Sequence, residues 1–139
     1  MDKPNIGQIN TPYGTILQEH ELQVANLLIK TGNNVDFIPV GLLPTADLRF
    51  MNLEWELKSP TGSGRRTIEK NLRKALRQST NVMLDLSRIA IAEDKCLLYL
   101  QNHIKNFREL KRLIIITKDQ KILKLSPKTA CIKEIPVLK

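Results

Sequence analysis

The sequence is poor in aromatic residues, which make up only 4% of its 139 residues. A protein that binds single-stranded nucleic acid by base stacking needs several exposed aromatic side chains, so the composition disfavours that mode of binding. The core is therefore expected to be rich in leucine and isoleucine, and a hydrophobic content of 42% is enough for the chain to fold. The length predicts one domain that spans residues 1–139.

Cysteine and histidine are equally scarce, with two of each. Cys96 and Cys131 do not combine with His20 and His103 in a metal-binding spacing, which excludes a zinc-ligand cluster. Both cysteines lie in apolar sequence, so we expect buried free thiols rather than a disulfide. No apolar run approaches the length of a membrane helix, and no signal peptide is recognisable.

Negative charge is the third deficit. Lysine and arginine number 22 against 14 acidic residues, which gives a net charge of +8. This excess favours a polyanionic partner, either a nucleic acid or an acidic protein.

The hydrophobic pattern predicts a small α/β domain with a mixed sheet flanked by helices. After an extended lead at 1–14, the predicted αβββαβ core is followed by a C-terminal helix and hairpin. The core consists of a helix at 16–30, a strand at 35–40, a hairpin at 47–58, a helix at 67–79 and a strand at 81–86. The later elements are a helix at 93–107 and strands at 112–117 and 121–125, with an unassigned tail at 126–139 that allows an edge strand at 132–137.

The predicted hairpin carries the most informative residues. If Met51 and Asn52 form a two-residue turn, Asp47 lies opposite Glu56, and Lys58 points to the same side of the strands. Like charges in this position repel each other, and a divalent cation between them would turn that repulsion into binding. A metal beside an ammonium group suits phosphodiester hydrolysis, whereas the simpler interpretation is a solvated polar face.

The first predicted helix supplies two further candidates. Glu21 falls within the apolar stripe of this helix, where an unpaired carboxylate is costly, and we predict that it is a third metal ligand. The alternative is a helix-end residue paired with a lysine. His20 is a candidate general base or phosphate contact, and it is equally compatible with an incidental position.

The segment after the hairpin is basic and rich in hydroxyl groups. The helix at 67–79 carries cations along one stripe, which favours phosphate contact, although charged helix faces are commonly just solvated. Thr67 is the predicted N-cap, and a helix start is a ready anion site. The predicted substrate-binding residues are Ser59, Thr61, Arg65, Arg66, Thr67, Lys70, Arg73, Lys74, Arg77 and Gln78.

These segments resemble a known family. The helix with His20 and Glu21, the Asp47 strand, the stretch from Trp55 to Gly64 and the stretch from Thr67 to Asp85 are similar to the C-terminal tRNA nuclease domain of contact-dependent growth inhibition (CdiA-type) toxins. The resemblance covers about residues 15–125. The layout also resembles the PD-(D/E)XK nuclease superfamily, except that Ala46 stands where a proline often precedes the aspartate.

The resemblance implies a metal-dependent endonuclease that cleaves tRNA in interbacterial competition. It maps the metal-binding residues onto Glu21, Asp47 and Glu56, with Lys58 beside them, and implies Mg²⁺, Mn²⁺ or Zn²⁺ as the cofactor. It further implies a cognate immunity protein, in a monomer or a toxin–immunity heterodimer. The domain would belong to a longer secreted or cell-surface effector and act in the cytoplasm of the target cell.

Three alternatives remain open at the level of sequence. In a metal-free ribonuclease of the colicin and barnase kind, His20, Lys58, Arg66 and Thr67 would carry out acid–base work and phosphate binding, and the acid pair would be structural. The second is a DNA endonuclease. The third is a non-catalytic nucleic-acid-binding module.

Overall fold

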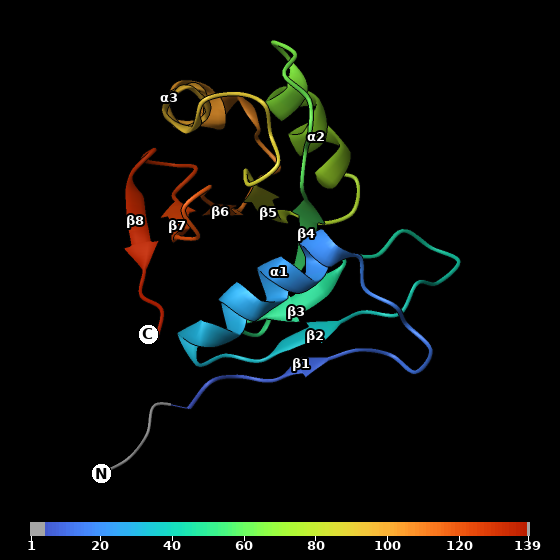
Figure 1. The fold of residues 1–139 in the computed structure, drawn as a ribbon. Helices are drawn as coiled ribbons and strands as arrows, with labels where there is room; N and C mark the ends of the chain where they lie inside the picture. The colour runs from blue at the N-terminus through green and yellow to red at the C-terminus, as the bar shows by residue number, and fades with distance from the viewer. Residues whose placement is uncertain (1–4, 139) are drawn as a thin grey trace.

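The computed structural model describes residues 5–138, which form a curled eight-stranded mixed sheet with helices on both faces (Figure 1). The strands are β1 (Ile9–Asn10), β2 (Val35–Phe37), β3 (Leu48–Phe50), β4 (Leu53–Lys58), β5 (Asn81–Asp85), β6 (Arg112–Ile116), β7 (Ile122–Leu125) and β8 (Ile132–Ile135). The helices are α1 (Glu19–Leu28), α2 (Thr67–Ala75) and α3 (Glu93–His103), with 3₁₀ turns η1 (Ile29–Thr31) and η2 (Ile104–Asn106).

The strands lie in the sheet in the order in which they occur in the chain. β4, β5 and β6 are parallel to one another, and α2 and α3 form the two crossovers between them. Strands buried on both faces are expected to be continuously apolar, and the cores of β5 and β6 follow this rule with Val82, Met83 and Leu84 and with 113–116. This parallel centre sets the hairpin of β3 and β4 next to the turn after α2, where the Ser79 hydroxyl donates to the Glu54 carbonyl at 3.0 Å.

Two apolar cores lie on opposite faces of the sheet. One joins α1 to the sheet and contains Leu28, Phe50 and Trp55. The other joins α2 and α3 to the sheet and contains Leu72 and Leu100. Because side chains alternate along a strand, the α1 face of β3 is apolar, and its other face carries exposed polar groups.

The predicted fold class and element order are confirmed, and most differences are at element ends. The predicted helix at 16–30 is α1 followed by η1, and it stops at Gly32, whose φ of 89° suits glycine. The predicted strand at 35–40 ends at Phe37, since Pro39 has no N–H to donate to a sheet. The predicted helices at 67–79 and 93–107 are shorter, and the second finishes as η2.

Both ends of the described chain contain a strand, whereas the sequence predicted an extended lead at 1–14 and an unassigned tail at 126–139. Ile9 and Asn10 pair in parallel with β2, which the sequence did not predict. The allowed edge strand at 132–137 is confirmed as β8. The remainder of these predictions, at 1–4 and 139, lies outside the described residues.

Both cysteines are free. Cys96 is buried as predicted, but the prediction of burial is wrong for Cys131, which is exposed beside the edge strand β8. None of the helices within residues 5–138 combines the length and apolarity that crossing a membrane requires.

Candidate functional site

The hairpin of β3 and β4 has the predicted turn and register. Met51 and Asn52 occupy the left-handed region, with φ of 53° and 63°, which matches a two-residue turn with both central φ values positive. Phe50 pairs with Leu53 and Leu48 with Trp55, as predicted. The Trp55 indole donates a hydrogen bond to the Phe50 carbonyl at 2.9 Å and fixes the turn from the core side.

Asp47 is held at the start of this hairpin by the backbone of β4. Its N–H donates to the Trp55 carbonyl at 3.0 Å. Its Oδ2 accepts a hydrogen bond from the Leu57 N–H at 2.8 Å. These two contacts fix the Asp47 carboxylate beside Glu56, which lies between the two backbone partners.

Glu56 is a buried carboxyl group with incomplete pairing. The residue is 5% exposed, and its Oε1 has no hydrogen-bond partner. Its Oε2 lies 3.3 Å from the Lys58 ammonium. Burial and the neighbouring Asp47 carboxylate raise the pKa of Glu56 to about 7, and the opposing effect of Lys58 is weaker.

This donor set fits a hard divalent cation. Two carboxylates with water completing the shell are ligands typical of Mg²⁺. The partnerless Oε1 of Glu56 is a buried oxygen that a cation would satisfy. Asp47 and Glu56 are therefore the residues that would hold the metal.

The acid pair lines a groove of about 350 Å³. Gln78, in the turn after α2, lines the same groove. The other wall is the loop at 38–46, from which Val40, Leu42 and Leu43 project with 98%, 106% and 78% exposure. The acidic groove therefore has an apolar rim.

The structure does not bring Glu21 into this pair. The Glu21 carboxylate instead accepts the Gln18 N–H at 2.9 Å and closes the first turn of α1. Its neighbour His20 lies on the same helix, which packs through Val24 on the opposite face of the hairpin. Across residues 5–138, no group of three acidic, histidine or cysteine side chains is placed to hold a metal ion.

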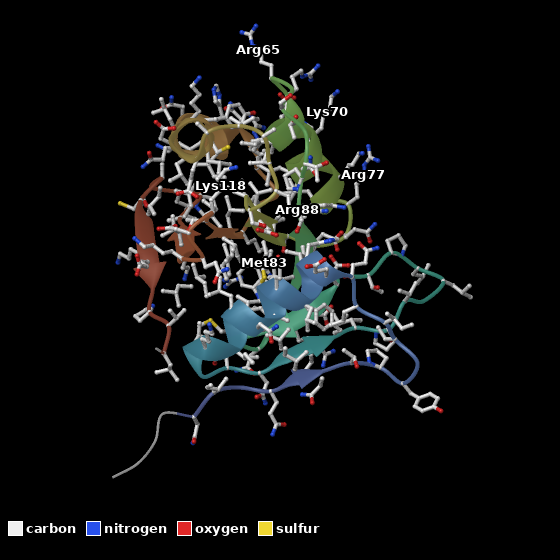
Figure 2. The ribbon with its side chains drawn as sticks, in the orientation of Figure 1. Arg65, Lys70, Arg77, Met83, Arg88 and Lys118 are labelled. Carbon is white, nitrogen blue, oxygen red and sulfur yellow. The ribbon has the colours of Figure 1, made fainter. Side chains whose placement is uncertain are left out.

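The cations of α2 are exposed, but they are not equivalent. Arg66 and Arg73 both approach Glu69, at 3.0 and 3.5 Å. Arg65, Lys70 and Arg77 extend outward from the segment before α2, from α2 itself and from the turn after it (Figure 2). These three and Lys74 form no ion pair with another described residue, so they are the cations available to a ligand.

The prediction that Thr67 is the N-cap of α2 is wrong. Thr67 is the first helical residue, and Arg66 occupies the cap position without a side-chain cap. The Thr67 hydroxyl lies close to Gly62 and Gly64, where an added Cβ would approach it to 3.1 and 3.3 Å. The glycines thus let the loop, which also contains exposed Thr61, pass close to the helix start.

Ser59 makes a contact that the sequence did not predict. Its hydroxyl donates to Asp85 Oδ2 at 2.9 Å, and its carbonyl accepts the Arg88 guanidinium at 2.7 Å. Asp85 is 1% exposed and also accepts the Ser87 N–H. These bonds fix the backbone directly after Lys58. The contact of Ser59 could have been inferred from Asp85, a carboxylate at the carboxyl end of the predicted strand that lies next to the end of β4.

The fold and this site define a mixed α/β domain with an acid pair in a groove at one sheet face and a lysine beside the pair. The family model of the contact-dependent growth inhibition CdiA C-terminal domain matches residues 44–122, and the chain belongs to this family.

A solved structure has a similar fold, namely the CdiA-CT/CdiI toxin and immunity complex from Burkholderia pseudomallei. The TM-score is 0.69 at 18% sequence identity, with 87% of this chain and all of the other chain covered. No curated protein matches the sequence.

Proposed function

We propose that this domain is a metal-dependent endonuclease of the PD-(D/E)XK type that cleaves RNA, with tRNA as its favoured substrate. The observation that carries the proposal is the buried Glu56 carboxyl beside Asp47, with one oxygen unpartnered and Lys58 at 3.3 Å from the other. Strongly perturbed carboxyl groups in a groove are typical of catalytic sites.

Each residue has a distinct role in this mechanism. Asp47 and Glu56 would hold the metal, which would supply activation of water and neutralisation of charge on the phosphate. Lys58 supplies a fixed positive charge beside the acid pair, where it orients the attacking water or a phosphate oxygen. Burial of Glu56 excludes bulk water and strengthens these interactions.

The positive charge of the chain supports a nucleic acid substrate. The free cations extend along α2 and the segments on either side of it, and Gln78 after this helix lines the groove, which supports contact between these cations and the phosphates that flank the acid pair. The preference for tRNA rests on the resemblance of the sequence to tRNA nuclease domains.

We also infer that the domain acts as a toxin and that a cognate immunity protein covers the groove. The similar Burkholderia pseudomallei domain was solved as a toxin and immunity complex. The exposed apolar side chains at 38–46 form a surface of the kind that protein partners bury, directly at the groove. The domain would be a monomer or a toxin–immunity heterodimer and would reach the target-cell cytoplasm as part of a longer secreted or surface protein.

The test is incubation of the purified domain with total RNA in Mg²⁺, Mn²⁺, Zn²⁺ or EDTA. We expect discrete fragments with one or more metals and none with EDTA. Glu56→Gln, Asp47→Asn and Lys58→Met should each lower kcat by about 100-fold or more, while RNA binding is kept. Glu54→Gln is the matched control, because Glu54 lies on the same strand face, is exposed and pairs with Arg49.

Other outcomes would identify the alternatives. Cleavage that survives EDTA and Asp47→Asn would indicate a metal-free ribonuclease. Cleavage of duplex DNA in preference to tRNA would indicate a DNA endonuclease. Binding without cleavage under every condition would indicate a non-catalytic module.

A further inference from the structure

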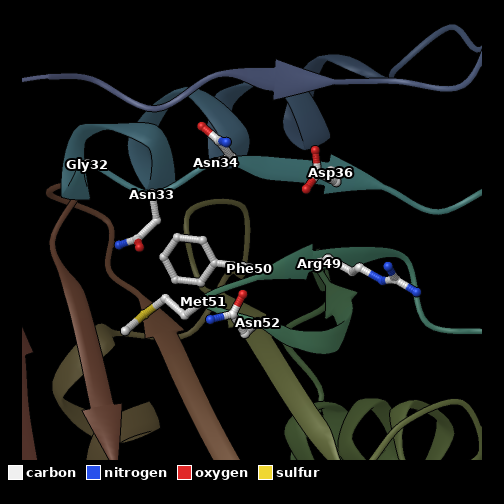
Figure 3. A pocket seen from close by; sticks show the side chains of 8 residues that line it. All are labelled: Gly32, Asn33, Asn34, Asp36, Arg49, Phe50, Met51 and Asn52. Atoms are coloured by element: carbon white, nitrogen blue, oxygen red, sulfur yellow. The ribbon is translucent and has the colours of Figure 1, made fainter.

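A second pocket opens at the tip of the hairpin. It has a volume of about 430 Å³ and lies between the turn after α1 and the turn of the hairpin (Figure 3). Its polar lining residues are Asn33, Asn34, Asp36, Arg49 and Asn52. Three carboxamide groups thus line one small space.

This pocket and the acid pair share one face of the sheet. Arg49 follows Asp47 by two residues on the hairpin, so the two side chains point to the same side. Three residues of strand separate Asp47 from the hairpin tip at Met51, a span of about 13 Å. A polymer that crosses the acid pair along the hairpin would therefore reach the pocket.

The carboxamides retain hydrogen-bonding capacity of both kinds. Asn33 donates to the Thr31 hydroxyl, which leaves its oxygen available. Asn34 accepts the Gln8 N–H, which leaves its amino group available. Asn52 is exposed and forms no side-chain hydrogen bond to another described residue, so it offers both a donor and an acceptor.

The charges of the pocket do not suit a phosphate. Arg49 is the single cation among its lining residues, and its guanidinium pairs with Glu54 at 3.3 Å. Asp36, the acidic residue among the lining residues, accepts a hydrogen bond from the Asn10 amide at 2.6 Å. An uncharged ligand with donors and acceptors in one plane matches this lining better than an anion.

The hairpin tip is also strained. Met51 has a φ of 53°, a conformation that glycine and asparagine adopt readily and methionine rarely does. Its side chain is 48% exposed. Strained backbone of this kind is concentrated at functional sites. An exposed methionine at the pocket also supplies a polarizable contact for an aromatic ring.

We propose that this pocket binds an unpaired nucleobase of the RNA strand that is cut at the acid pair. Carboxamides recognise base edges by paired hydrogen bonds, and a guanidinium plane can stack on a base in place of an aromatic side chain. The inference rests on the proposed nuclease function and adds to it a specificity-determining site. The substrate strand runs from the free cations of α2, across the acid pair, to the carboxamide pocket.

The test compares Asn52→Gly with wild type on RNAs that differ in single bases near the cleavage site. Glycine accepts the φ of 63° at this position, so the variant removes the carboxamide and keeps the turn. We expect KM for the preferred RNA to rise about tenfold, the preference among bases to be lost, and kcat to stay within twofold. Arg49→Lys, which keeps the charge and removes the planar group, should have the same effect if Asn52→Gly does not fold.

Asn102→Ala is the matched control, since it removes an exposed carboxamide from α3, away from the hairpin. Unchanged KM and base preference in folded Asn52→Gly and Arg49→Lys would overturn the proposal. Weaker binding of an immunity protein with unchanged RNA cleavage would also overturn it and assign the pocket to a protein interface. If the nuclease proposal itself is wrong, wild type will cut no RNA, which distinguishes that outcome from a failure of the pocket proposal alone. The pocket proposal would then be wrong as well.

Discussion

At the scale of single residues, Glu56 is the side chain whose charge and surroundings conflict most. Its pKa is about 7 in the folded protein, against an ordinary value of 4.5. The folded state therefore binds more protons than the unfolded state between these pH values, and its stability falls as pH rises through this window. Below pH 4.5 this contribution to stability is fully present, and above pH 7 it is lost.

Glu56→Gln is expected to reverse this loss. In the absence of metal, the variant should exceed wild type in free energy of unfolding by up to about 3 kcal/mol above pH 7, and the difference should vanish near pH 4.5. Urea unfolding at pH 4.5 and pH 8 measures this change. Mn²⁺ should stabilise wild type at pH 8 and leave the variant unchanged. Parallel pH profiles for the two proteins would show that Glu56 ionises normally.

The residues of the acid pair and Lys58 were predictable because strand side chains alternate with a fixed period. Asp47, Glu56 and Lys58 needed only a turn position to share a face. Glu21 was not predictable in the same way, since the sequence of a helix does not define which face of the sheet it covers. The role of Ser59 was also beyond the pattern, because its partner Asp85 is 26 residues away.

At the scale of elements, α2 carries cations in two states. Arg66 and Arg73 share Glu69, which holds the pKa of that carboxyl below its usual value, chiefly through Arg66. Lys70, Lys74 and Arg77 have no described acidic partner. The sequence predicted a stripe of cations on this helix. It did not predict which of them pair with Glu69, because that depends on side-chain geometry within the helix.

Replacement of Lys70, Lys74 and Arg77 by glutamine should therefore weaken RNA binding and lower its dependence on salt. Each lost phosphate contact is expected to reduce the slope of log K against log salt by about 0.7 to 0.9. Glu69→Gln is the informative counterpart, because it releases Arg66 and Arg73 and should steepen the slope. Fluorescence anisotropy with cleavage-deficient Glu56→Gln protein measures both, and equal slopes in all variants would exclude α2 from the RNA interface.

The elements themselves were largely predictable, and their boundaries less so. The hairpin register followed from one correctly placed turn. The helices were predicted too long, since α1 and α3 finish as 3₁₀ turns that keep the apolar spacing of a helix, and α2 finishes in a turn at 76–78. β1 escaped prediction because two residues carry too little periodicity to be recognised.

At the scale of the whole molecule, the exposed apolar side chains of the loop at 38–46 contrast with the net positive charge of the chain. If the proposed immunity protein covers the groove, Leu42→Ser with Leu43→Ser should weaken its binding by about 2 kcal/mol or more, since apolar side chains at the centre of an interface dominate its energy. Calorimetric titration of the purified domain with the separately purified immunity protein measures the change in binding free energy. RNA cleavage by the free domain should stay within twofold of wild type.

Leu98→Ser provides the control for this prediction. Leu98 is 59% exposed on α3, far along the chain from the groove, and its replacement should leave the affinity unchanged. Equal losses in both proteins would indicate a general effect of surface polarity. An unaltered affinity in the Leu42 and Leu43 variant would place the partner elsewhere.

The architecture was predictable at this scale because strands that are consecutive in the sequence are also neighbours in the sheet. The alternation of helices and strands requires parallel strands with crossovers, and β4, β5 and β6 meet that requirement. The closing antiparallel strands follow from their short connections. The groove was not predictable, since it depends on the path of the loop at 38–46, which has no periodic pattern.

The arrangement of the strands in chain order has a kinetic consequence. Every strand pairs with the next strand in the chain, but the parallel pairings join residues far apart in sequence, such as Asn81 and Arg112. The antiparallel hairpins close short loops and are expected to form early, whereas the parallel pairings across α2 and α3 close longer loops and are expected to form later. Refolding after denaturation would then start at the hairpins and be limited by the docking of the parallel centre.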